Sequence, residues 1–219
     1  MKKLLICCLL AVTMNSCSIL AFIFFGITPT NKYFPPYSQL ALYSEDYKPN
    51  SKGQIRTDGV YLPFDTATSR FNIDADGLVY GRLFYHDGSY ATIVCDPDSI
   101  SNSDLSVKLA DAQGIYSIYG DTVIIEAYLK GKKWFLEDAV FKIEGQDTLK
   151  LILQEFYHPT GSNRINLFKG DFMYRFVPAT QLPDSRELKV KREKWLWRDK
   201  NEWKEYRKSL KAWEKQRHP

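Results

Sequence analysis

Four cysteines and three histidines are the side chains of this 219-residue chain that could serve as thiol nucleophiles, imidazole general bases or soft metal ligands. They are Cys7, Cys8, Cys17 and Cys95, with His86, His158 and His218. Their spacing matches no metal-ligand pattern, and the chain contains neither a nucleophile elbow nor a phosphate-cradling glycine loop. The sequence therefore predicts a protein that is not an enzyme, with no metal and no cofactor.

Cys17 is the cysteine with the most informative surroundings. The chain starts with two lysines, continues with an apolar run over residues 4–12, and reaches Met14-Asn15-Ser16 directly before Cys17. A basic start, a short apolar run and a small-residue site are the parts of a secretory signal. The segment Met14-Asn15-Ser16-Cys17 resembles the lipobox of bacterial lipoproteins, although Met14 stands where that family prefers Leu and Asn15 is larger than usual. The resemblance implies that Cys17 becomes the lipidated first residue of the mature chain.

An uncleaved signal anchor is the alternative interpretation of the same segment. Residues 4–27 form a run of 24 residues without any charge, and about 20 apolar residues span a bilayer. Lys2 and Lys3 would then stay on the cytoplasmic side. Both interpretations place the body in the cell envelope, anchored to the periplasmic face of the outer or inner membrane. Nucleic acid is not expected as a partner of an exported protein.

The charge of the chain is distributed unevenly. Residues 184–219 contain 13 Lys or Arg and 7 Asp or Glu. The net charge of the whole chain is +4, so a mildly acidic body precedes a basic tail. This pattern divides the chain into four regions: the signal over 1–17, an apolar segment and proline-containing spacer over 18–53, a β domain over 54–180, and a basic tryptophan-rich helix over 184–217.

Period-two alternation of apolar residues predicts the strands of the β domain. We expect a strand over 54–62, hairpins over 78–95, 114–130 and 134–156, and a last strand over 171–177, with residues 96–113 as a polar excursion. Short links between neighbouring strands predict an antiparallel up-and-down meander of about eight strands, which can close into a small barrel. The hairpin over 114–126 is similar to hairpins of lipocalin-like bacterial envelope proteins, which implies a lipocalin-like barrel over 54–180; a meander-rich sandwich remains the alternative.

Two groups of residues are candidate binding sites. If the barrel encloses a ligand cavity, its lining would include Tyr80, Arg82, Phe84, Tyr128 and Trp134. The long C-terminal helix presents one face at steps of three and four residues, which consists of Trp195, Trp203, Tyr206, Leu210 and Trp213. That face could pack on the barrel, bind a partner helix or a second copy, or lie on anionic lipid.

The sequence thus predicts a membrane-tethered envelope lipoprotein that acts as a structural or protein-interaction module. The first alternative is a lipocalin-like carrier of a small apolar or lipid ligand. The second alternative is a single-pass, signal-anchored protein with the same exported body.

Overall fold

The structure is a computed structural model that describes residues 53–100, 105–130, 134–157, 164–193, 197 and 200–217. These ranges belong to the β domain and the C-terminal segment. The predicted signal, Cys17 and the spacer up to residue 52 lie outside the described residues, as do Trp195, His158 and His218.

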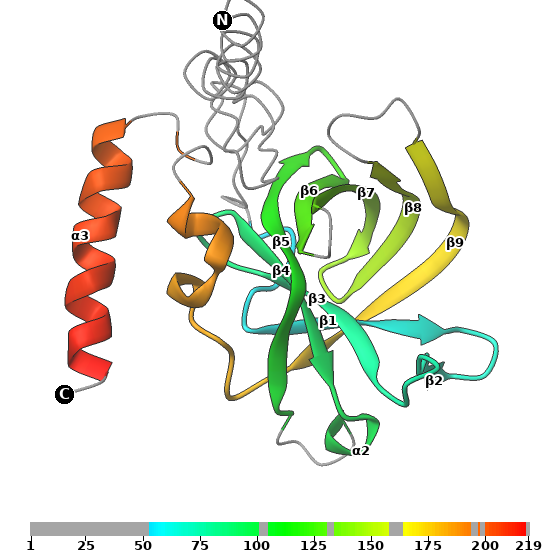
Figure 1. Cartoon of the computed structure of the whole chain (residues 1–219). Helices are drawn as coiled ribbons and strands as arrows, with labels where there is room; N and C mark the ends of the chain where they lie inside the picture. The colour runs from blue at the N-terminus through cyan, green and yellow to red at the C-terminus, as the bar shows by residue number, and fades with distance from the viewer. Residues whose placement is uncertain are drawn as a thin grey trace, which may run out of the picture. The chain divides into compact units, whose positions relative to one another are not determined.

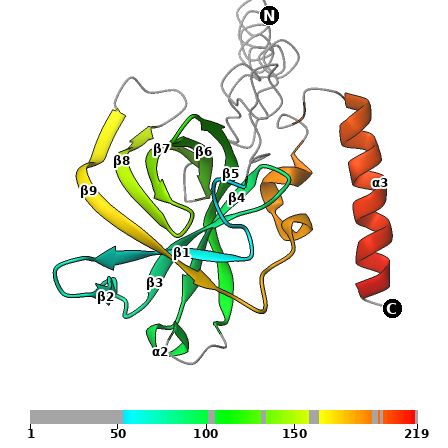
Figure 2. The same cartoon turned by 180° about the vertical axis from the view of Figure 1, so that it is seen from behind.

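An antiparallel barrel of eight strands is the centre of the described part of the chain (Figure 1). The strands are β1 (Gly59–Asp65), β3 (Val79–Phe84), β4 (Ser89–Cys95), β5 (Val107–Tyr119), β6 (Thr122–Lys130), β7 (Trp134–Gly145), β8 (Thr148–Tyr157) and β9 (Arg164–Pro178). Each strand pairs with the next, and β1 also pairs with β9 over six residue pairs, from Gly59↔Pro178 to Phe64↔Met173. This last pairing closes the sheet, as Figure 2 shows from behind. The predicted fold, an antiparallel meander closed into a small barrel, is confirmed.

The remaining elements are short, apart from the C-terminal helix. They are strand β2 (Arg70–Phe71), which pairs with β1, helix α2 (Pro97–Ile100), the 3-10 helices η3 (Ser185–Glu187) and η4 (Lys189–Arg192), and helix α3 (Lys200–Arg217).

Glycine at position 59 allows the closing strands to approach each other. A Cβ atom on Gly59 would lie 2.2 Å from the carbonyl oxygen of Val177 and 2.5 Å from the ring of Phe176. Backbone atoms cannot move aside as a flexible side chain can, so a larger residue here would push β1 away from β9.

Aromatic and aliphatic side chains fill the end of the barrel that carries the β3–β4, β5–β6 and β7–β8 turns. Phe84 is fully buried there, with its ring centroid 5.7 Å from that of Tyr61 and 5.0 Å from that of Tyr116. Ile55, just before β1, packs in the same cluster and is 2% exposed. Gln54 donates to the carbonyl of Gly120 at 2.5 Å, so the segment that carries Ile55 is fixed across this end. We call it the covered end of the barrel.

A second apolar cluster lies on the outer surface of the barrel. It consists of Val60, Leu62, Val79, Leu83, Ile93, Cys95, Leu105 and Val107. Strands β1, β3 and β4 are therefore buried on both faces along much of their length. Burial raises the pKa of the Cys95 thiol to about 11, so Cys95 is a buried, protonated side chain of this cluster.

The C-terminal helix is shorter than the sequence predicts. Helix α3 has 18 residues, whereas the pattern predicts one continuous helix over 184–217. Residues 185–192 form two 3-10 turns, and Leu188 (ψ 119°) and Glu193 (ψ 127°) are extended at their ends. The physical reason is a tertiary contact: the side-chain oxygen of Gln113 on β5 accepts hydrogen bonds from the backbone N–H groups of Lys189 (2.7 Å) and Val190 (3.4 Å). Such contacts override a modest local helix propensity.

Candidate functional site

A buried ion pair crosses the interior of the barrel. Arg82 on β3 donates from Nη1 to Oε1 of Glu137 on β7 at 2.9 Å. The two side chains are 7% and 2% exposed. Alternation along the strands explains their position, because Arg82 shares a face with the core residue Phe84 and Glu137 shares a face with the core residue Ala139.

Neutral polar groups complete the site around this pair. The same Nη1 atom donates to the hydroxyl of Tyr90 and, at 3.5 Å, to the hydroxyl of Thr92. Gln154 on β8 donates from Nε2 to Oε1 of Glu137 at 2.7 Å. Buried charges are tolerated when they are paired and hydrogen-bonded in this way.

Electrostatics keep Arg82 charged. Burial alone lowers its pKa, but the Glu137 carboxylate, together with the hydroxyl groups of Tyr90 and Tyr174, raises the pKa well above the usual value for arginine. Burial also raises the pKa of Tyr90. At neutral pH, Tyr90 is therefore a neutral hydroxyl that accepts a hydrogen bond from the guanidinium.

A cavity of about 570 Å³ opens above the ion pair, away from the covered end. Its described lining consists of Asp74, Tyr80, Arg82, Thr92, Val94, Leu109, Ala110, Asp111, Ala112, Glu137, Gln154 and Phe156. Polar groups thus form its inner end, and Val94, Leu109 and Phe156 supply apolar wall. Every hydrogen bond that Arg82 makes to the described residues leaves from Nη1, so Nε and Nη2 retain donor capacity beside this cavity.

The structure brings together only part of the predicted cavity lining. Arg82 is at its inner end, and Tyr80 is at its rim, 37% exposed, with its hydroxyl bonded to Asp76 at 2.6 Å. Phe84 belongs to the filled half of the barrel.

Tyr128 does not line the cavity as predicted. It follows the inward-facing Ala127 on β6, and its register partner is Gln113, the residue that contacts η4. The side chain therefore lies on the outer face of the barrel. Trp134 is the first residue of β7, and its side chain lies outside the described part of the structure.

Sequence reasoning missed Glu137 and Gln154. A usable signal was present, because Glu137 lies two and four residues before Ala139 and Phe141 and so takes an inward position in the same alternation. Two opposite charges at inward positions of one barrel, Arg82 and Glu137, should pair with each other.

The second candidate site is the apolar face of α3, which packs on the chain itself. Trp203 donates from Nε1 to the carbonyl of Arg192 at 3.3 Å. The ring of Tyr206 lies 4.8 Å from that of Trp197, and Leu210 is 1% exposed. Trp213 lies between two arginines, with Arg186 4.8 Å and Arg217 5.2 Å from its ring centroid. The described part of the predicted contact face of α3 is thus in contact with Arg186, Arg192 and Trp197 of the same chain.

The segment under α3 is in turn fixed to the barrel. Lys191, 7% exposed, donates from Nζ to Oδ2 of Asp87 in the β3–β4 turn at 2.5 Å, and Ser185 donates to the same oxygen at 3.0 Å. Burial would raise the pKa of Asp87, but the Lys191 ammonium lowers it below the usual value for aspartate. We use the name C-terminal arm for residues 184–217 as far as they are described.

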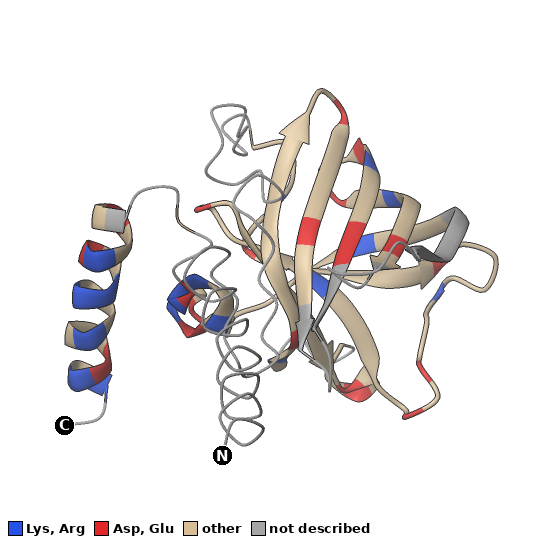
Figure 3. Ribbon diagram, turned by 45° about the horizontal axis from the view of Figure 1, so that its top comes forward, with Lys and Arg blue, Asp and Glu red and all other residues tan. Residues whose placement is uncertain are grey.

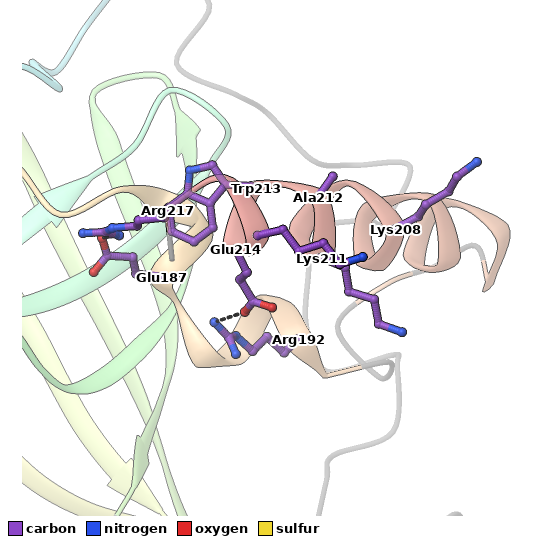
Figure 4. Close-up of a pocket in the computed structure, with 9 residues that line it drawn as sticks. Glu187, Arg192, Lys208, Lys211, Ala212, Trp213, Glu214 and Arg217 are labelled. Carbon is purple, nitrogen blue, oxygen red and sulfur yellow. Dashed lines mark hydrogen bonds and ion pairs between the residues drawn. The ribbon is translucent and has the colours of Figure 1, made fainter. Parts of the chain in front are cut away.

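A groove of about 1060 Å³ runs along the end of α3 (Figure 4). Its two acidic residues are already engaged: Glu214 accepts from Arg192 at 3.0 Å and Glu187 from Arg217 at 2.5 Å. The lysines on its rim have no such partner among the described residues.

Other chemistry is sparse in the described ranges. His86 bonds to Thr57 at 2.7 Å in the β3–β4 turn, at the covered end, away from the cavity. Among the described residues, no group of three or more His, Cys, Asp or Glu is placed to hold a metal ion. None of the described helices is both long and apolar enough to cross a bilayer. No family model, curated protein or solved structure matches the chain.

Proposed function

We propose that this chain is a non-enzymatic binding protein of the bacterial cell envelope, with a barrel that takes a small ligand into its open half. The observation that carries this proposal is the cavity above the Arg82–Glu137 pair. Its volume falls within the range of about 300–1,000 Å³ that is typical of ligand sites, and it combines apolar walls with a few convergent polar groups.

The polar inner end indicates the class of ligand. Arg82 and Glu137 neutralise each other at the inner end, and the exposed carboxylates Asp74 and Asp111, which also line the cavity, disfavour an anionic ligand. The remaining guanidinium donors favour an acceptor such as a carbonyl, ester or amide oxygen. The apolar walls favour a hydrocarbon or ring portion beyond that oxygen.

Attachment to a membrane is part of the same proposal and rests on the sequence alone. The lipobox-like segment that ends at Cys17 supports a lipid anchor, and the 24 uncharged residues over 4–27 support an uncleaved anchor as the alternative. A single acyl chain holds a protein weakly, whereas the several chains of a bacterial lipoprotein would hold it stably. Either anchor would place the barrel at the envelope.

A protein-interaction role through the apolar face of α3 is less well supported. That face already contacts the arm segment through Trp203, Tyr206 and Trp213. A partner helix would have to displace these contacts before it could bind.

Native mass spectrometry of the full chain, purified in a mild detergent, tests the ligand proposal. We expect an added mass that disappears on denaturation. Ala110→Trp should remove it by filling the cavity from the wall. Ile152→Trp is the matched control, because Ile152 is 41% exposed and does not line the cavity. A clean protein mass for the wild type, or an added mass unaffected by Ala110→Trp, would contradict the proposal.

A further inference from the structure

We propose that α3 binds the surface of an anionic phospholipid bilayer through four exposed lysines, Lys204, Lys208, Lys211 and Lys215. We call these four residues the lysine stripe. All four are exposed, and Figure 3 shows basic residues on several successive turns of α3, with fewer acidic residues between them. The binding involves only charged headgroups and goes beyond the ligand site in the barrel.

The spacing of the stripe places its members on one face. Steps of four, three and four residues keep the lysines within an arc of about 60° at 100° per residue, and along about 16 Å of the helix. The centre of this arc is about 150° from the centre of the apolar face that carries Trp203, Tyr206 and Trp213. The apolar face packs on the arm segment, whereas Lys208, Lys211 and Lys215 are exposed and line the open groove beside that contact.

The positive charge of the stripe is not neutralised within the described part of the chain. Neighbouring lysines three and four residues apart repel one another and weaken an isolated helix. None of the four forms an ion pair with a described residue, and the two acidic residues of the adjacent groove are paired with Arg192 and Arg217 (Figure 4). Helix α3 as a whole has seven basic and three acidic residues. The cost of this like-charge array is offset if the array faces an anionic surface.

A lipid surface fits the stripe better than insertion into a bilayer or contact with a protein. Insertion would require the apolar face, which the chain itself occupies. Lysine is a flexible point-charge partner for phosphate, and clusters of four to eight basic residues are typical of segments that bind anionic headgroups. Each lysine near such a surface strengthens binding roughly fivefold. The inference rests on the proposed membrane attachment only in that the anchor would bring α3 close to lipid.

The test uses the full chain reconstituted with vesicles of phosphatidylcholine, or of phosphatidylcholine mixed with phosphatidylglycerol. Flotation of the vesicles reports attachment of the protein. The acylation rate of each lysine, measured by peptide mass spectrometry, reports access to the stripe. Lys108 and Lys142 are exposed on the barrel and serve as internal references. We expect acylation of the stripe to be at least about fivefold slower on the anionic vesicles, and protection to disappear at high salt, where screening shortens the range of charge interactions.

Two double variants distinguish the effect of the lysine stripe from the effect of the net charge of the protein. Lys204→Gln with Lys208→Gln should reduce the protection of Lys211 and Lys215, because half of the array is lost. Lys108→Gln with Lys142→Gln makes the same change in net charge on the barrel and should leave that protection intact. Circular dichroism of each variant verifies that the fold is retained.

Each outcome bears on a different proposal. Equal acylation of the stripe on both vesicle types, with the protein attached to both, refutes the lipid-binding proposal and leaves the anchor intact. Protection on neutral vesicles that increases with protein density indicates a second copy as the occupant, and also refutes it. Flotation with anionic vesicles alone, lost at high salt, supports the stripe while it refutes the proposed anchor.

Discussion

Replacement of Glu137 by glutamine removes one charge from the buried pair and leaves Arg82 without its counter-ion. Glutamine has nearly the same size and retains an oxygen that can accept from Gln154, so the change is mainly electrostatic. The side chains of Arg82 and Glu137 are 7% and 2% exposed, so water from the adjoining cavity can compensate for only part of the lost charge interaction. We expect Glu137→Gln to lower the free energy of unfolding by about 3–5 kcal/mol, the usual cost of breaking one side of a buried ion pair.

Urea unfolding, followed by circular dichroism, measures this change. With a denaturant slope near about 2 kcal/mol per molar, a loss of about 4 kcal/mol lowers the midpoint by about 2 M. The slope itself should not change, because the surface exposed on unfolding stays the same. A changed slope would mean that the variant perturbs the folded or unfolded ensemble instead.

Strand β7 provides a matched control for the same chemical substitution. Glu144 forms an ion pair with Lys142 at 3.6 Å, with side chains 38% and 49% exposed. Glu144→Gln should cost only about 0–1 kcal/mol, because exposed pairs are screened by water.

A double variant distinguishes the lost charge from general damage to the core. Arg82→Met combined with Glu137→Leu removes both charges and fills the space with apolar atoms. Such replacements are often neutral or stabilising, so the double variant should be more stable than Glu137→Gln. Equal midpoints for Glu137→Gln and Glu144→Gln, or a double variant that is no more stable than Glu137→Gln, would refute the reasoning.

Three further predictions concern the covered end, the C-terminal arm and the outer cluster. Ile55→Ala should lower the free energy of unfolding by about 2–5 kcal/mol in the same urea assay, because it leaves a cavity beneath the segment that covers the barrel. The pKa of Asp87 is lowered in the folded protein, so its pair with Lys191 stabilises the fold fully above the ordinary carboxyl pKa of about 4, and this stabilisation is lost as the pH falls through the lower folded pKa. Asp87→Asn should therefore flatten the acid side of a plot of unfolding free energy against pH. An unchanged acid side would contradict the pairing. Burial raises the pKa of Cys95 to about 11, so Cys95 should resist alkylation at about pH 8 in the folded protein and react in urea. Peptide mass spectrometry measures this difference, and rapid alkylation of the folded protein would contradict the burial of Cys95.

Local signals in the sequence were sufficient to predict the barrel. The turns at Asp87-Gly88 and Gly120-Asp121 separate apolar runs of period two, and in the structure Gly88 and Gly120 have φ values of 80° and 62°. Positive φ at such positions is what tight hairpins require. Because each of the eight barrel strands pairs with the next barrel strand along the chain, only the β1–β9 closure joins strands that are distant in the sequence.

The first half of β5 shows where the periodic signal failed. Residues 96–113 are predicted as a polar excursion, yet β5 begins at Val107 and pairs with β4 from Cys95↔Val107 onward. Asp111 interrupts the apolar alternation here, and the register shifts between Ala91 and Ile93 on the partner strand. An irregular pairing of this kind depends on both strands and cannot be seen in one strand alone.

The predicted length of the C-terminal helix was wrong for a different reason. Its predicted start at 184 has the correct cap, since Asp184 accepts from the N–H of Arg186 at 2.8 Å. The cap opens a 3-10 turn instead, because Gln113, 76 residues before Lys189, binds the backbone there. A pattern read from local residues contains no information about a partner at that distance in the sequence.

The contact with Gln113 also changes how the tryptophan-rich arm should be interpreted. A continuous helix over 184–217 would have one long apolar face in need of a partner outside the chain. In the structure, the break at 185–193 lets the first part of the arm lie on the barrel through Lys191 and Asp87, where it receives Trp203, Tyr206 and Trp213 from α3. These aromatic residues therefore contribute to internal packing, and the side chains of α3 that remain available to bind a partner are mainly its exposed lysines. The two proposals therefore rest on different parts of the chain: ligand binding on the open half of the barrel, and surface binding on the lysines of α3.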